Sequence, residues 1–143
     1  MKLREMLQGL KMEARTVTVT EAQIPEVEKW LGMKLGPQLR EYILEYSLLW
    51  TEEVEEIMSI NAEIGPKSRM VIYTNRMREA YRGMENYVMI EHEAIEYVDT
   101  VVDGEDNVFW IDVKENGLVP ANMKLFDYIV ARIKDGDKVF FED

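Results

Sequence analysis

The chain has 143 residues, of which 28 are acidic and 17 are basic, giving a formal net charge of −11. It has no cysteine and one histidine, His92, which excludes disulfides, thiolate metal sites and any mechanism that needs two histidines. No apolar run approaches the roughly 20 residues that cross a bilayer, and the charged N-terminus lacks the apolar stretch of a signal peptide. We therefore expect a single cytoplasmic domain spanning residues 1–143.

The first twenty residues predict a short helix followed by an extended segment. Apolar side chains recur at helical spacing in residues 2–13, which is typical of an amphipathic helix. Residues 16–19 alternate threonine and valine. Because β-branched residues favour extended backbone, this segment is expected to be extended.

A second helix is predicted to start near Thr20. Thr20 and Gln23 have the spacing of a capping box, which opens helices. Pro25 lacks a backbone N–H and disturbs that start, so either the first turn is distorted or the helix begins near Ile24. Gly32 is expected to end the helix in a left-handed conformation.

The clearest helix opens at Gly36-Pro37, with Pro37 at the first helical position. An apolar stripe continues from there at helical spacing as far as Trp50. We expect its aromatic side chains to be core, because each can bury about 150–250 Å2. Residues 54–60 then predict a short strand.

Residues 68–81 combine strand propensity with a helical apolar stripe, and their arginine-rich remainder suits an exposed helix face. We therefore predict a helix there. Three strands follow, at residues 87–91, 95–102 and 107–113, and the last two flank the hairpin turn of residues 103–106. The third strand is apolar on both faces and is expected to be central in its sheet.

Asn122 is expected to cap a last helix, whose apolar positions repeat from Leu125 to Ile133 and which ends at Gly136. The tail, residues 138–141, is expected to pair as a strand or to fray. Consecutive strands with helices before and after them predict an α+β fold, with an antiparallel sheet and helices grouped around it.

The negative charge is concentrated in one part of the chain. Residues 83–113 hold nine acidic side chains and no lysine or arginine, whereas residues 67–82 hold five basic side chains and one acidic one. Either the two segments pack together and partly neutralise each other, or the acidic one forms an exposed face. The net charge disfavours nucleic acid and anionic membranes as partners, and it favours basic partners through long-range steering.

No group of residues with catalytic chemistry stands out in the sequence. Glycine-rich phosphate loops and a nucleophile elbow are absent, and residues 103–106 do not match a calcium loop. In a regular strand, Glu91 and Glu93 would point to one face and His92 to the other. We expect no catalytic residue, metal or cofactor. A polar pocket joining His92 to two carboxylates would instead favour a small enzyme or a small-molecule binder.

The stretch IPEVEKWLGMKLGPQLREYILEYSLLW resembles the opening of the SUKH superfamily, in which a helix of the form hxxhExxLG leads into a second helix. The segment EYVDTVVDGEDNVFWIDV resembles the family's hairpin, and LFDYIVARI resembles its last helix. The likeness runs from about Thr20 to Ile133. Gly36-Pro37 departs from the family's usual Leu-Pro order. The matching positions in the opening are Glu28, Leu31, Gly32, Leu35, Tyr42 and Leu44.

The resemblance implies an α+β fold without catalytic residues. Bacterial members of the family are largely immunity proteins that bind and block a cognate toxin, often a nuclease, and fungal members are interaction proteins of cell-wall regulation. We therefore predict a protein-binding module that neutralises a basic toxin domain through an acidic surface, with a regulatory scaffold as the alternative. The candidate contact residues are Glu91, Glu93, Glu96, Asp103, Glu105 and Asp106.

Overall fold

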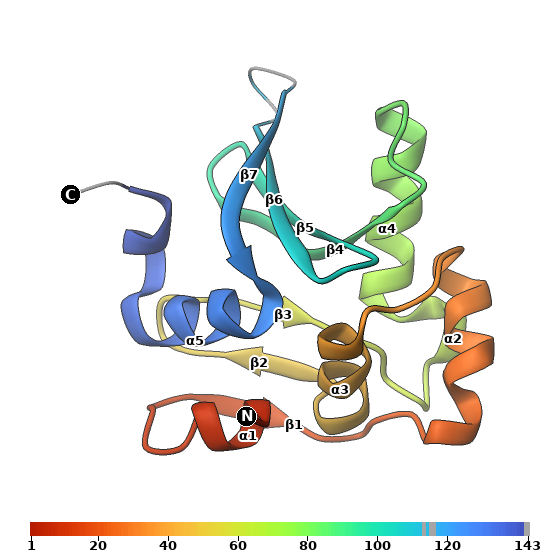
Figure 1. Ribbon diagram of the computed structural model, residues 1–143, viewed down its shortest axis with the longest axis horizontal. Helices are drawn as coiled ribbons and strands as arrows, with labels where there is room; N and C mark the ends of the chain where they lie inside the picture. The colour runs from red at the N-terminus through yellow and green to blue at the C-terminus, as the bar shows by residue number, and fades with distance from the viewer. Residues whose placement is uncertain (113, 115–116, 142–143) are drawn as a thin grey trace.

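The computed structural model describes residues 1–112, 114 and 117–141. It contains two antiparallel sheets with helices around them, which confirms the predicted fold class (Figure 1). The smaller sheet has the order β1-β2-β3 and the larger one the order β4-β5-β6-β7. The strands are β1 (Glu13–Arg15), β2 (Leu48–Trp50), β3 (Ile57–Met58), β4 (Tyr87–Ile95), β5 (Val98–Asp103), β6 (Asn107–Asp112) and β7 (Gly117–Lys124).

The helices join the two sheets around one buried core. Helix α4 packs on β4 and against α2, while α5 contacts β6, β7 and α3 (Figure 1). The α-helices are α1 (Leu3–Met6), α2 (Ile24–Leu31), α3 (Pro37–Glu45), α4 (Arg69–Ala80) and α5 (Leu125–Asp135), and the 3-10 helices are η1 (Glu21–Gln23), η2 (Gly65–Lys67) and η3 (Gly136–Phe140).

The N-terminal segment differs from its prediction. Helix α1 covers only Leu3–Met6, and Gly9 follows with a φ of 85°, a left-handed conformation that does not continue a helix. Strand β1 covers Glu13–Arg15, before the segment 16–19 that is expected to be extended, and residues 16–19 belong to no helix or strand. The predicted helix over residues 2–13 is therefore too long. The apolar residues keep helical spacing beyond Met6, but the backbone at Gly9 is not helical.

The start and end of α2 follow the sequence prediction. The capping box of Thr20 and Gln23 is present, the first turn is the 3-10 helix η1, and α2 begins at Ile24. Gly32 ends it with a φ of 69°. The Glu28 carboxylate accepts a hydrogen bond from the backbone N–H of Leu35 at 2.8 Å, which fixes the turn that leads into α3.

Helix α3 begins at Pro37 as predicted, but it ends at Glu45 and not at Trp50. The chain becomes extended at Tyr46, and β2 pairs with β1 on one side and β3 on the other. The pairing satisfies backbone groups and buries Leu49 completely. The apolar stripe that predicts a longer helix therefore continues through a strand instead. The strand expected over residues 54–60 shortens to β3.

The second half of the chain follows the prediction closely up to Asp112. Helix α4 and the hairpins of β4, β5 and β6 are present, and β6 lies between β5 and β7. The predicted cap at Asn122 is wrong, because Asn122 lies inside β7 and α5 begins at Leu125. Gly136 ends α5 as expected. Residues 136–140 form η3, so the tail up to Phe140 is neither a strand nor frayed.

Candidate functional site

The six candidate contact residues do not form one acidic face. Glu93, Glu96 and Glu105 are exposed and Asp103 is half-buried, whereas Glu91 and Asp106 are each only 2% exposed. The last two are therefore buried and not exposed contact residues, and the prediction for Glu91 and Asp106 is wrong. Each of them has a structural partner within the fold.

Asp106 stabilises the first turn of α3. Its Oδ2 and Oδ1 atoms accept the backbone N–H groups of Gln38 and Leu39 at 2.9 and 3.0 Å. A carboxylate at this position satisfies free helix donors and complements the helix dipole. A Cβ on Gly36 would overlap the Asp106 carboxylate, so this close approach favours glycine.

Asp103 organises its own hairpin turn. Its Oδ1 atom accepts the backbone N–H groups of Glu105 and Asn107, each at 2.9 Å. The side-chain amide of Asn107 donates to Oδ2 at 3.1 Å. Glu105 at the tip of this turn remains exposed.

Glu91 belongs to a buried network with Arg132 and Tyr128. The Arg132 Nε atom lies 3.1 Å from both carboxylate oxygens of Glu91, and the Tyr128 hydroxyl donates to Oε1 at 2.6 Å. Burial raises the pKa of Glu91 above its ordinary value of 4.5, while Arg132 and Tyr128 oppose the rise. Burial disfavours the charge of Arg132, but Glu91 and Tyr128 hold the pKa of Arg132 above its ordinary value.

Arg132 connects three parts of the fold. It extends from α5, donates to the carbonyl of Ala94 on β4 at 2.8 Å, and donates to Asp137 of η3 at 2.8 Å. Its guanidinium carbon also lies 4.8 Å from the ring centroid of Phe140. Arg132 therefore holds the end of β4 and the C-terminal turn in place on α5.

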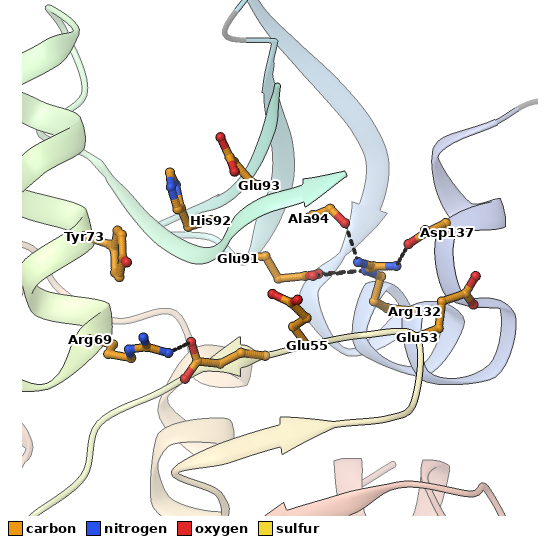
Figure 2. Close-up of a pocket in the computed structure, with 11 residues that line it drawn as sticks. Glu53, Glu55, Arg69, Tyr73, Glu91, His92, Glu93, Ala94, Arg132 and Asp137 are labelled. Carbon is orange, nitrogen blue, oxygen red and sulfur yellow. Dashed lines mark hydrogen bonds and ion pairs between the residues drawn. The ribbon is translucent and has the colours of Figure 1, made fainter. Parts of the chain in front are cut away.

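A polar hollow of about 400 Å3 opens beside this network. Figure 2 shows that its walls come from α4, from β4, from the segment that leads into β3, and from α5 with η3. The lining residues are Glu53, Glu55, Glu56, Arg69, Tyr73, Glu91, His92, Glu93, Ala94, Arg132 and Asp137. We call this hollow the acidic pocket.

His92 lines the acidic pocket together with both of its glutamate neighbours, contrary to the strand alternation expected from the sequence. The β4–β5 register shifts between Glu91 and Ile95, and Glu93 has a φ of 46°. Such an irregularity re-aims side chains that a regular strand would separate. Figure 2 shows His92 and Glu93 on one side of β4, whereas Glu91 extends toward Arg132, so the expectation is wrong for His92 and Glu93.

Two contacts hold the imidazole of His92. Its Nδ1 atom lies 3.0 Å from Oδ1 of Asp99, and its ring stacks on Tyr73 with the centroids 4.8 Å apart. The same Asp99 oxygen accepts the backbone N–H of Glu93 at 2.7 Å. Asp99 is 4% exposed, so a buried carboxylate anchors a histidine side chain that is 44% exposed.

The acidic pocket carries more negative than positive charge. Six of its lining residues are acidic and two are arginines. Arg132 is occupied by Glu91 and Asp137, and Arg69 forms an ion pair with Glu56. Within the described residues, the carboxylates of Glu53, Glu55 and Glu93 have neither an ion pair nor a hydrogen bond. Glu53, Glu55 and Glu93 are all exposed residues that remain available to a ligand.

Sequence reasoning identified only part of this pocket. It gave Glu91, His92 and Glu93, which are adjacent in the chain, but it did not connect them with Tyr73, Arg132 or the remaining wall. On the opposite wall of the pocket, the only local sequence feature that indicated a site was the group of four glutamates between positions 52 and 56. Over the part of the chain that the structure describes, no group of three or more acidic or histidine side chains is arranged to hold a metal ion.

Comparison with protein-family models and with curated proteins gives no match for this sequence. Among the helices that the structure describes, none has both the length and the apolar character needed to cross a membrane.

Proposed function

We propose that this chain is a non-catalytic protein-binding module that neutralises a basic toxin domain through the surface around the acidic pocket. The observation that carries the proposal is the set of unpaired, exposed carboxylates of Glu53, Glu55 and Glu93 around one concave site. The SUKH resemblance agrees with such a role. A domain that holds phosphates presents positive charge, and a carboxylate-rich concavity complements it and accelerates encounter.

The surface in this proposal differs from the one predicted from sequence alone. Of the six sequence candidates, Glu93 lines the pocket as an exposed residue, and Glu96 is exposed in the turn that follows β4. Glu105 belongs to the β5–β6 turn, where Lys124 donates to its backbone carbonyl at 2.9 Å. The proposed contact surface is therefore centred on Glu53, Glu55 and Glu93.

An inhibition assay tests the function. Where a gene beside that of this chain encodes a basic toxin domain, the chain is titrated into that purified domain and the activity of the domain is measured. We expect stoichiometric loss of activity. Full activity at a molar excess of the chain would contradict the immunity role. Binding to an enzyme of cell-wall synthesis, with no effect on a toxin, would support the regulatory alternative.

The geometry of His92 favours one further candidate function, a small-molecule binder with acid–base chemistry. An imidazole beside a buried aspartate and open to a polar cavity is an arrangement that can hold or move a proton. Turnover of a substrate that is lost in the variant His92→Gln, while the fold is retained, would favour this candidate over the binding module.

A further inference from the structure

We infer that the acidic pocket binds a guanidinium group, and that its natural source is an arginine side chain presented by the protein partner. The inference rests on the proposed function and specifies the chemistry of the contact. Three independent features support it: the unpaired charge of the pocket, its aromatic wall, and an unpartnered buried hydroxyl in a second hollow that Arg69 also lines.

The unpaired carboxylates of the pocket favour a cation that has several hydrogen-bond donors. Glu55 approaches from the segment before β3 and Glu93 from β4, so the unpaired carboxylates lie on different walls (Figure 2). A guanidinium has five N–H donors in a fixed plane and can bind carboxylates on more than one side. An ammonium group is a compact point charge without this planar arrangement.

The aromatic wall provides a surface for the same group. Tyr73 and His92 are stacked and both line the pocket. Guanidinium groups stack on aromatic faces more readily than ammonium groups do. The Tyr73 ring already has one such contact, because the guanidinium carbon of Arg76 lies 5.3 Å from its centroid.

A second hollow of about 70 Å3 shares Glu56 and Arg69 with the acidic pocket. Ser59 lines this hollow, is 3% exposed, and its Oγ atom has no hydrogen-bond partner in the described structure. A buried hydroxyl without a hydrogen-bond partner is unfavourable, because it has lost its hydrogen bonds to water. The structure therefore contains an enclosed hydroxyl without a partner in a hollow that the Arg69 side chain also lines.

The unpartnered hydroxyl of Ser59 suggests how the pocket can accept a guanidinium group in addition to that of Arg69. Arg69 is paired with Glu56 and 63% exposed, and an incoming cation would repel it. If Arg69 turns into the second hollow, it can donate to Ser59 Oγ. The carboxylate of Glu56 is then free to bind the ligand. The pocket thereby gains a carboxylate at the moment of binding, and the hydroxyl of Ser59 gains its missing partner.

The first experiment is a titration of the full chain with propylguanidinium at low ionic strength, followed by amide chemical shifts. Propylurea, which has a similar shape and no charge, is the matched ligand control. We expect saturable shifts in residues 92–94 and 69–73 with propylguanidinium alone. An absence of saturable shifts there, or equal shifts with propylurea, would overturn the inference.

Pocket variants locate the binding. Glu55→Gln and Glu93→Gln should each weaken binding about two- to fivefold, the range for an exposed ion pair. Glu26→Gln changes the net charge equally on an exposed position of α2 and should leave the affinity unchanged. Equal weakening by all three variants would overturn the site. Ser59→Ala should also weaken binding, and an unchanged affinity would refute the movement of Arg69.

Two peptides test the source of the guanidinium. Acetyl-Gly-Arg-Gly-amide should shift the same residues as propylguanidinium, and the lysine peptide should bind more weakly. Binding of free propylguanidinium without binding of the arginine peptide would overturn the assignment to a protein side chain. If none of these ligands binds but reversal of the pocket charges still abolishes partner association, the inference fails while the proposed function stands.

Discussion

The buried network around Arg132 gives the sharpest prediction of stability. In the variant Arg132→Met, the aliphatic part of the side chain is largely retained, but Glu91 loses its cation at a position that is 2% exposed. Breaking a buried ion pair by removing one partner costs about 3–5 kcal/mol. We expect about 3 kcal/mol, because Tyr128 still donates to Glu91 and the carboxyl can take up a proton. That loss is large against a typical folding stability of about 5–15 kcal/mol.

The pH dependence of the loss follows from the direction of the Glu91 pKa shift. Burial already raises this pKa, and removal of Arg132 takes away the main factor that lowers it. A carboxyl whose pKa is raised by folding destabilises the folded state as the pH rises through that pKa. The deficit of Arg132→Met should therefore be smallest near or below 4.5, the ordinary pKa of glutamic acid, and should grow toward neutral pH.

Urea denaturation of both proteins over a pH series measures this deficit. The double variant Arg132→Met/Glu91→Gln is the matched control, because it removes both charges and retains an acceptor for Tyr128. It should recover most of the lost stability and most of the pH dependence. A deficit under about 1 kcal/mol at neutral pH, the range of an exposed ion pair, would refute a buried network. A deficit that does not change with pH would refute the role of Glu91.

Two glycines give further predictions of unfolding free energy. Gly36→Ala should lose about 1–2 kcal/mol, the value of a helix cap, because the new Cβ displaces the Asp106 carboxylate from the start of α3. The φ of Gly36 is −68°, which alanine adopts freely, so a variant within about 0.5 kcal/mol of the wild type would contradict the capping role. Gly136→Ala should lose about 1–3 kcal/mol, because Gly136 has a φ of 60° and its new Cβ would overlap the carboxylate of Glu53. In the double variant Gly136→Ala/Glu53→Ala, only the part of the lost stability that is due to the overlap should return. Complete recovery of the stability would show that alanine adopts this backbone conformation without strain.

Local signals in the sequence were sufficient for several elements of the fold. The capping box at Thr20, the glycine at position 32 and Pro37 each act within one helical turn, and the structure confirms all three. The Asp-Gly hairpin turn is likewise specified by residues that contact one another locally. Such features are predictable because their partners are close in the chain.

Elements that depend on distant partners were not predictable in this way. The apolar stripe of α3 continues to Trp50, but pairing with β1 and β3 converts its end into β2. Strand β7 was missed because Leu118 and Val119 are exposed and Pro120 interrupts any strand pattern. In both cases the tertiary pairing, and not the local propensity, decides the conformation.

Dependence on distant partners also explains why only part of the acidic pocket was predicted from the sequence. Glu91 was predicted to be exposed because its neighbours in the chain are acidic, yet its partner Arg132 lies 41 positions away. His92 joins Glu93 in the pocket only because of the irregularity in β4. The concentration of negative charge was visible in the sequence, whereas its division into paired and unpaired carboxylates required the fold.

The association rate constant between this chain and the basic domain that it inhibits in the titration above, measured by stopped flow over a salt series, tests the central proposal most directly. The decisive variant carries Glu53→Lys, Glu55→Lys and Glu93→Lys, and its control reverses the exposed Glu26, Glu63 and Glu79. Electrostatic steering accelerates association by about 10- to 1,000-fold and weakens as the Debye length falls to about 8 Å at physiological salt. The pocket variant should associate at least about tenfold more slowly than the control at low salt. Equal rates for the two variants, or a wild-type rate that does not change with salt, would contradict the acidic pocket as the contact surface.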